Sequence, residues 1–302
     1  MLRLERVSKT YRVGAFGRGT LRAVRDVSFE LRPGQVTSLI GESGSGKSTI
    51  GRMILRLLRP TSGSITFGGS DITGLRGAEL KEYYRHAQGV FQDPFSTYNP
   101  IFRADRVFAM IHQSFFPSVK HDEWGDRVAD AVRSVNLNPD LVLGKYPHQL
   151  SGGQLQRLLV ARALLLDIKL LVADEIISML DASTRIDVLN LLADLKERGL
   201  AVLFITHDLS LGNYLSDQTV ILRKGAIVER GVTEKVFGDP RHPYTRTLLA
   251  SVPRLGVRWE DLPVPETEGH ACDAPLDEVE DDHFVACFDT AGVHHGRKSE
   301  PV

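Results

Sequence analysis

The octapeptide Gly41-Glu42-Ser43-Gly44-Ser45-Gly46-Lys47-Ser48 is the strongest indicator of the fold in this sequence. It fits the pattern G-x-x-x-x-G-K-[ST], in which glycines let backbone N–H groups turn toward phosphate oxygens. An apolar run, Val36–Ile40, precedes it as a predicted strand, and a predicted helix, Thr49–Leu58, follows it. The helix N-terminus adds about half a positive charge at the same place. This strand–loop–helix context predicts a nucleoside-triphosphate site rather than a structural glycine turn.

Each residue of the loop has an expected task. Lys47 is expected to meet the β- and γ-phosphates, and the hydroxyl of Ser48 is expected to bind Mg²⁺. The remaining predicted ATP-binding residues of the loop are Gly41, Ser43, Gly44, Ser45, Gly46 and Thr49.

Composition excludes several classes of protein. The chain has 302 residues and a formal net charge of −1, so its bulk charge gives no sign of a nucleic-acid partner. The first 13 residues lack the apolar core that a signal peptide has, so we do not expect them to be one. The most apolar stretch, Leu158–Leu180, is interrupted by charged residues, and a membrane span needs about 20 mostly apolar ones. We therefore expect any membrane role to come through a partner.

Alternation of predicted strands and helices indicates an α/β fold with a mainly parallel sheet. The further buried strands are expected at Gly89–Phe91, Leu170–Ala173, Val202–Thr206 and Thr219–Leu222, and a further helix at Thr184–Arg198. Two segments break this alternation. Leu2–Leu31 has the pattern of an antiparallel sheet, with a Gly-rich insert at Gly14–Thr20, and Phe95–Tyr146 is expected to be a helical insertion.

These patterns divide the chain into an ATPase domain, residues 1–250, and a C-terminal extension, residues 251–302. Residues of about 95–165 are expected to form a helical subdomain within the first. The extension is rich in acidic residues, above all at Glu278–Asp282, and we expect it to have weak core content and partial disorder.

A second site element is the run Leu170–Glu175, an apolar strand that ends in two carboxylates. Asp174 is expected to hold Mg²⁺, directly or through water, and Glu175 to polarise the attacking water. Acidic pairs at strand ends are common. The phosphate loop elsewhere in the chain is what favours the catalytic interpretation.

A third element, Leu150-Ser151-Gly152-Gly153-Gln154, precedes a predicted helix at Leu155–Leu166. Ser-Gly-Gly at a helix start is again anion-binding geometry. One protein could hold two phosphates in this way, or two copies could hold one phosphate chain between them. Taken alone, the run is more typical of an ordinary loop than of a phosphate site.

Together these motifs resemble the ABC (ATP-binding cassette) ATPase family over roughly Leu2 to Val252. Gln92 is placed like the family's Q-loop glutamine, Ser178–Asp181 is similar to its D-loop, and His207 looks like its switch histidine. Tyr11 is placed like the aromatic residue that stacks on adenine, although a tyrosine near a strand end is as often a packing residue. The implied fold is a RecA-like P-loop core with an antiparallel β subdomain and a helical subdomain.

The resemblance implies roles for these residues. The catalytic set would be Lys47, Gln92, Glu175 and His207, with the imidazole contacting the γ-phosphate and Gln92 sensing Mg²⁺ or the water. The signature residues Ser151, Gly152, Gly153 and Gln154, and Asp181 of the D-loop, would serve the ATP held by a second cassette. ATP and Mg²⁺ are therefore the expected substrate and metal.

A closer resemblance is to the ATPases of oligopeptide and dipeptide importers. It rests on Phe91–Pro100, Tyr146–Gly153 and the post-core segment Asp239–Leu249. It implies a second, non-identical ATPase subunit, two transmembrane permease subunits, an extracytoplasmic solute-binding protein and a place on the cytoplasmic membrane face. The implied cargo is a peptide or a related solute such as an oligosaccharide; nickel is also carried by relatives of this type.

The sequence departs from that pattern in three places. Ile176, Ile177 and Met179 stand where the family has proline and small residues, and Thr97-Tyr98 stands where Ser-Leu is common. No catalytic group is lost, so we expect hydrolysis. Family members with an iron–sulfur cluster need four thiolates, whereas this chain has only Cys272 and Cys287, for which we expect two unligated thiols and no cluster.

Three other functions remain open from the sequence. A non-transport ABC ATPase of translation or DNA repair usually carries two cassettes or a long coiled coil. A small-molecule P-loop kinase would not need Leu150–Gln154. A regulatory module that binds ATP without turnover would not need Glu175 and His207.

Overall fold

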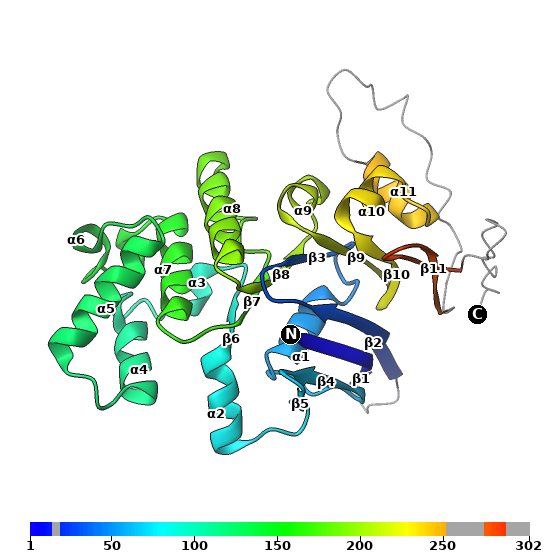
Figure 1. Cartoon of the computed structure of the whole chain (residues 1–302). Coiled ribbons are helices and arrows are strands. Elements are labelled where there is room, and N and C mark those ends of the chain that lie inside the picture. The colour runs from blue at the N-terminus through cyan, green and yellow to red at the C-terminus, as the bar shows by residue number, and fades with distance from the viewer. Residues whose placement is uncertain (14–18, 252–274, 288–302) are drawn as a thin grey trace. The chain divides into compact units, whose positions relative to one another are not determined.

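The computed structural model describes residues 1–13, 19–251 and 275–287, and it divides the chain into two compact units (Figure 1). The first unit comprises Met1–Gly74 and Leu203–Val302, and the second comprises Leu75–Val202.

The first unit contains the predicted antiparallel sheet. Its strands follow the order β2-β1-β4-β5. Their bounds are β1 Leu2–Val13, β2 Gly19–Leu31, β4 Ser62–Phe67 and β5 Ser70–Asp71. Alternate residues such as Leu2 and Leu4 are buried, the period-2 pattern of a half-buried strand. The antiparallel prediction for Leu2–Leu31 is confirmed, while residues 14–18 of the Gly-rich insert lie outside the described residues.

A second sheet in this unit contains strands in the order β11-β12-β10-β9-β3-β8. They are β3 Val36–Ile40, β8 Ala201–Thr206, β9 Gln218–Arg223, β10 Ala226–Val232, β11 Leu276–Glu280 and β12 His283–Ala286. β3 and β9 are parallel, but β9, β10, β12 and β11 pair antiparallel. The two-residue turn between β9 and β10, with positive φ at Lys224 and Gly225, imposes that reversal.

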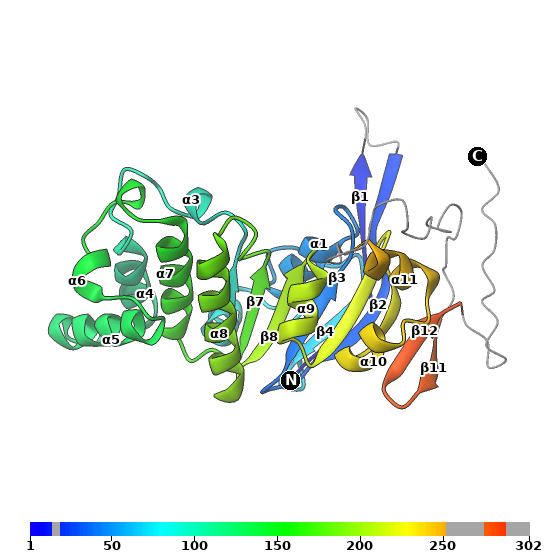
Figure 2. The same ribbon diagram turned by 90° about the horizontal axis from the view of Figure 1, so that it is seen from above.

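Four helices cover this sheet's strands: α1 Lys47–Ile54, α9 Leu209–Leu215, α10 Thr233–Gly238 and α11 Pro243–Ala250. In Figure 2, α9, α10 and α11 lie beside β3, β9 and β10. One core cluster joins Leu209, Val236 and Tyr244 of these helices to Ile40, Ile221 and Val228 of the strands. α1 ends earlier than the predicted Leu58, because Arg56 takes a left-handed conformation that a helix cannot continue.

The second unit contains the parallel pair β6 Ala87–Val90 and β7 Leu170–Asp174. The predicted helical insertion is confirmed. Its helices are α3 Pro94–Thr97, α4 Arg106–Phe115, α5 His121–Ser134, α6 Pro139–Val142, the 3₁₀ turn Pro147–Gln149 and α7 Gly152–Leu164. The unit also has α2 Gly77–His86 and α8 Ala182–Glu197. Trp124, Val128 and Val132 form the buried face of α5, which packs on α7 (Figure 1).

The C-terminal extension differs from its prediction where it is described. Residues 276–286 form the hairpin β11–β12, which pairs with β10. His283, Val285 and Ala286 are fully buried, so the expected weak core content is wrong for this part. Two partners that are distant in sequence, β10 and β12, create this core, and an acidic composition does not reveal such pairing. Residues 252–274 and 288–302 of the extension lie outside the described residues.

Candidate functional site

The phosphate loop lies between β3 and α1, and close packing determines its glycines. A Cβ at Gly41 would lie 2.1 Å from the carbonyl oxygen of Leu222. Gly46 has φ +106°, and a Cβ there would lie 2.4 Å from the carbonyl oxygen of Ala23. Any side chain at either position would collide with backbone. The loop therefore keeps a backbone-lined form suited to phosphate.

Lys47 is buried and turned into the loop. Its Nζ donates to the carbonyl oxygens of Gly41 at 2.7 Å and Glu42 at 2.9 Å. Ser43 and Gly44 are exposed, whereas Ser48 and Thr49 are half-buried in the first turn of α1. An ammonium, a hydroxyl and a loop of backbone N–H groups at one helix start fit a phosphate chain with its metal.

Tyr244, which the sequence did not indicate as a site residue, also contacts the loop. The backbone N–H of Glu42 donates to the hydroxyl of Tyr244 at 3.2 Å. From the sequence, the post-core segment Asp239–Leu249 indicates only a resemblance to the importer ATPases. Pro243 at the first position of α11 is the local signal that Tyr244 lies at a helix start, but nothing local indicates the loop as its partner.

His207 and Tyr11 also belong to the first unit. His207 is exposed and directly follows β8, and the next residue, Asp208, caps α9 by accepting from the N–H groups of Ser210 and Leu211. Tyr11 is half-buried in β1, with Nζ of Lys9 at 5.3 Å from its ring centroid.

In the second unit β7 ends in the two predicted carboxylates. Asp174 is buried, and Glu175 is half-buried with φ +51°. A left-handed glutamate is strained, which is typical of functional turns. Ile176 and Ile177 are buried behind it, so these departures from the family pattern pack into the core, whereas Met179 is exposed.

Helix α7 begins at Gly152, three residues earlier than predicted, so it includes both signature glycines and Gln154. Ser151 is the N-cap: its hydroxyl accepts from the N–H of Gln154 at 3.2 Å, and the side chain of Gln154 accepts from the N–H of Ser151 at 2.8 Å. This capping box fixes the loop and leaves Gly152 and Gly153 in the first turn, where helix N–H groups have no partner within the helix.

The signature loop and the D-loop meet within this unit. A Cβ at Gly153 would lie 2.3 Å from Cγ2 of Thr184. Asp181 caps α8 and accepts from the N–H and hydroxyl of Thr184 and from the hydroxyl of Ser183. These hydrogen bonds hold the pKa of the Asp181 carboxyl well below its usual range, and the one from the hydroxyl of Ser183 has the largest effect.

The Q-loop is tied to α7. Gln92 is exposed, but the carbonyl oxygen of the preceding Phe91 accepts from Nε2 of Gln156 at 3.3 Å. The hydroxyl of Tyr98, one of the departures from the family pattern, donates to the carbonyl oxygen of Leu155 at 3.3 Å. Burial raises the pKa of Tyr98. The Thr97-Tyr98 variation thus connects the Q-loop to the helix that begins with the signature.

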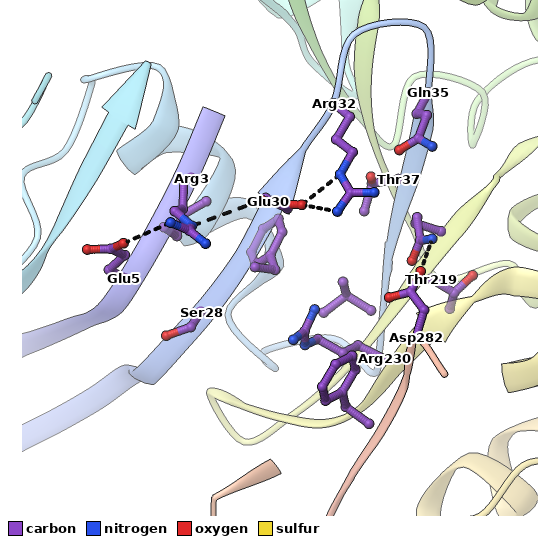
Figure 3. Close-up of a pocket in the computed structure, with 15 residues that line it drawn as sticks. Arg3, Glu5, Ser28, Glu30, Arg32, Gln35, Thr37, Thr219, Arg230 and Asp282 are labelled. Carbon is purple, nitrogen blue, oxygen red and sulfur yellow. Dashed lines mark hydrogen bonds and ion pairs between the residues drawn. The ribbon is translucent and has the colours of Figure 1, made fainter. Parts of the chain in front are cut away.

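The predicted site residues therefore fall into two groups. The first unit holds Tyr11, His207 and the phosphate loop; the second holds Gln92, Asp174, Glu175, Asp181 and the signature loop. A cavity of about 410 Å³ in the first unit contains none of them (Figure 3). Its charged groups include Arg32, which is paired with Glu30.

Two further findings bear on the predictions. The expected free thiol at Cys287 is wrong, because this residue is disulfide-bonded; the other cysteine of the chain, Cys272, lies outside the described residues. Residues 285–287 are buried, so the sulfur of Cys287 lies in an apolar part of the fold that suits a disulfide.

The second finding concerns membrane spans. None of the helices within residues 1–13, 19–251 and 275–287 has the length and apolar composition that a membrane span requires.

The fold and these motifs define an ATP-binding cassette. Residues 24–178 match the family model described as "ABC transporter", and residues 228–275 match "Oligopeptide/dipeptide transporter, C-terminal region". The ATP-binding cassette MJ0796, solved as a dimer in a post-hydrolysis state with ADP and Pi, is 28% identical with a TM-score of 0.69. That alignment covers 77% of this chain and 99% of the other.

Relatives that match over most of their own length point to a narrower class of transporter ATPase. A probable peptide ABC transporter ATP-binding protein of Sinorhizobium fredii is 40% identical, over 90% of this chain and 80% of that protein. The oligopeptide transport ATP-binding protein OppF of Bacillus subtilis is 37% identical, over 89% and 91%. The dipeptide transport ATP-binding protein DppF of Lactococcus lactis is 40% identical, over 89% and 88%. The chain belongs to the ABC transporter ATPases, in their oligopeptide/dipeptide branch.

Proposed function

We propose that this chain hydrolyses ATP to drive the import of peptides through a membrane permease, from the cytoplasmic face. The observation that carries the proposal is the presence in one chain of the cassette and of the oligopeptide/dipeptide C-terminal region. A translation, repair or kinase function would not account for the second match. We also propose 1–250 as the ATPase domain and 251–302 as the branch-specific extension.

Enzymes catalyse phosphoryl transfer mainly by positioning the reactants and stabilising the developing charge, and less by forming covalent intermediates. Lys47 and the loop N–H groups would hold the β- and γ-phosphates, and Tyr11 would stack on the adenine. The proposed Mg²⁺ ligands are Ser48, Asp174 and Gln92, which would offer the hydroxyl, carboxylate and amide oxygens that this ion prefers. The metal, when bound, neutralises charge on the phosphate oxygens.

Hydrolysis needs a base for the attacking water. We assign that role to Glu175 and the γ-phosphate contact to His207. Ser151, Gly152 and Gly153 would bind the γ-phosphate held by a second cassette, with Gln154 fixing the loop through the capping box and Asp181 lying at the shared interface. A non-identical second ATPase subunit, two permease subunits and a solute-binding protein would complete the transporter.

The test of the assignment is Glu175→Gln in the assembled transporter. We expect ATP binding to persist while turnover falls by about 100-fold or more, the range typical for loss of a general base. Glu197→Gln is a matched control, because that side chain is 78% exposed at the end of α8. Turnover of Glu175→Gln at the control's rate would remove Glu175 as the base. Uptake of labelled peptides compared with oligosaccharides then tests the cargo.

A further inference from the structure

Tyr244 is the residue through which the post-core segment reaches the phosphate loop. Its ring is buried in the cluster formed with Ile40 and Ile221, and the guanidinium of Arg223 lies 4.9 Å from the ring centroid. Its hydroxyl accepts from the N–H of Glu42 at 3.2 Å. Burial raises the pKa of Tyr244 to about 12, so the hydroxyl stays protonated near neutral pH.

Glu42 is held on both sides of its backbone. Its N–H bonds to Tyr244, and its carbonyl oxygen accepts from Nζ of Lys47 at 2.9 Å. The N–H of Glu42 also shares a rigid peptide unit with the carbonyl oxygen of Gly41, which accepts from Nζ of Lys47 at 2.7 Å. The hydrogen bond to Tyr244 therefore restricts the orientation of one of the two carbonyl groups that hold the ammonium of Lys47. The tyrosine hydroxyl thus contributes to the shape of the loop without being part of it.

A buried carboxylate fixes the segment that carries Tyr244. Glu229 of β10 is fully buried and accepts from the backbone N–H groups of Arg241 at 2.8 Å and His242 at 3.0 Å. His242 in turn caps α11, since its Nδ1 accepts from the N–H of Tyr244 at 3.0 Å. The carboxylate therefore determines where α11 begins.

The C-terminal hairpin completes this set of hydrogen bonds. Nε2 of His283, in β12, lies 2.8 Å from Oε1 of Glu229, and both side chains are buried. The adjacent turn is attached to the same unit, since Nε2 of Gln218 donates to Asp282 at 2.7 Å (Figure 3) and the N–H of Val232 donates to the carbonyl oxygen of Asp282 at 3.1 Å. A buried carboxylate needs all its donors, so loss of the hairpin would release the segment.

We propose that Tyr244 is a positioning residue for the phosphate loop, and that the Glu229–His283 pair makes its placement depend on the docked C-terminal hairpin. The inference rests on the proposed ATP-binding role of residues 41–48. In this proposal, the C-terminal hairpin influences nucleotide affinity through Tyr244, although the hairpin itself does not contact the nucleotide.

The first test is Tyr244→Phe in the full-length chain, which keeps the ring and removes the hydroxyl. We expect the Kd for a fluorescent ATP analogue with Mg²⁺ to rise about 2- to 10-fold, the effect of one hydrogen bond. Amide exchange of peptides covering residues 41–48 should accelerate, while the melting temperature of the unit stays close to that of the parent. Tyr214→Phe is the control, because Tyr214 is 69% exposed.

An unchanged Kd together with unchanged exchange at residues 41–48 would overturn the positioning role. Failure of the proposed function is distinguishable: the parent chain and Lys47→Ala would then bind the analogue equally poorly. Amide exchange in Tyr244→Phe would still report on the loop in that case.

The second test concerns the hairpin. His283→Gln should accelerate exchange at residues 41–48 and weaken nucleotide binding, and Tyr244→Phe combined with it should bind no more weakly than Tyr244→Phe alone. Fully additive effects would overturn the dependence on the hairpin. If His283→Gln fails to fold, Gln218→Ala serves instead, because it removes a hydrogen bond to the hairpin turn but keeps His283 beside Glu229. This variant should also accelerate amide exchange at residues 41–48. No change in exchange there would overturn the dependence on the hairpin.

Discussion

At the scale of single residues, Gly153 is a position where a missing side chain creates the site. It is buried at the start of α7, and the space that a Cβ would need is held by the methyl group of Thr184. Thr184 in turn is fixed by its hydrogen bonds to Asp181. The glycine of the signature is therefore required both by the anion it is proposed to bind and by the D-loop helix that packs behind it.

This packing predicts the behaviour of Gly153→Ala. The new methyl group should lower the free energy of unfolding by about 1–3 kcal/mol, as overpacking does, and should lower ATPase activity by displacing the loop. Adding Thr184→Ser removes Cγ2 but keeps the hydroxyl, so the double variant should recover most of both losses. Urea unfolding and ATPase assays check this. A double variant as impaired as Gly153→Ala would show that the alanine acts on the nucleotide rather than through Thr184.

At the scale of elements, the helices that start at the signature loop and at the D-loop are both fixed by side-chain caps. Ser151 caps α7 and Asp181 caps α8. Each cap satisfies N–H groups that a helix start leaves open, and Asp181 adds a negative charge at the positive end of the helix. The loops are thereby rigid before any nucleotide or partner arrives, which lowers the entropy that binding must overcome.

Asp181 predicts a particular pH dependence. Its pKa is lower in the folded state than the ordinary 3.8, so the ionised carboxylate adds stability that is fully present above 3.8 and is lost as pH falls through the folded-state value. The parent should therefore be more stable than Asp181→Asn by a constant margin from pH 8 to about pH 5, with the margin closing only in stronger acid. Urea unfolding at stepped pH measures it. A margin that vanished between pH 7 and pH 5 would contradict the lowered pKa.

At the scale of the whole molecule, the phosphate loop and the signature loop belong to different compact units. A similar cassette was solved as a dimer with ADP and Pi. In our proposal each loop acts on a different nucleotide, so a single chain holds two half-sites and completes neither.

The corresponding prediction concerns activity in isolation. ATP hydrolysis per chain should rise at least about tenfold when the chain is assembled with its proposed partner cassette, because removing transition-state donors typically costs 100-fold or more. Ser151→Arg in this chain should leave nucleotide binding to its own loop intact while lowering hydrolysis at the partner's nucleotide. Equal activity of the isolated and assembled chain would contradict a shared site.

Features that depend on local backbone conformation could be predicted from the order of the amino acids alone. The phosphate loop, the strand before it and the carboxylates at the end of β7 all follow from short runs whose residue types dictate their conformation. The bounds of β3 agree with the prediction, and α7 begins earlier than predicted only because the signature glycines are themselves helical. Family membership follows from these motifs in order.

Contacts that join distant segments of the chain became visible only in the folded structure. Glu42 and Tyr244 are 202 positions apart, and Glu229 and His283 are 54 apart. No spacing rule connects such pairs, since their meeting depends on which strands pair and which helices pack. An acidic tail that looked poor in core residues became two strands with buried side chains, because β10 offered an edge on which they could pair.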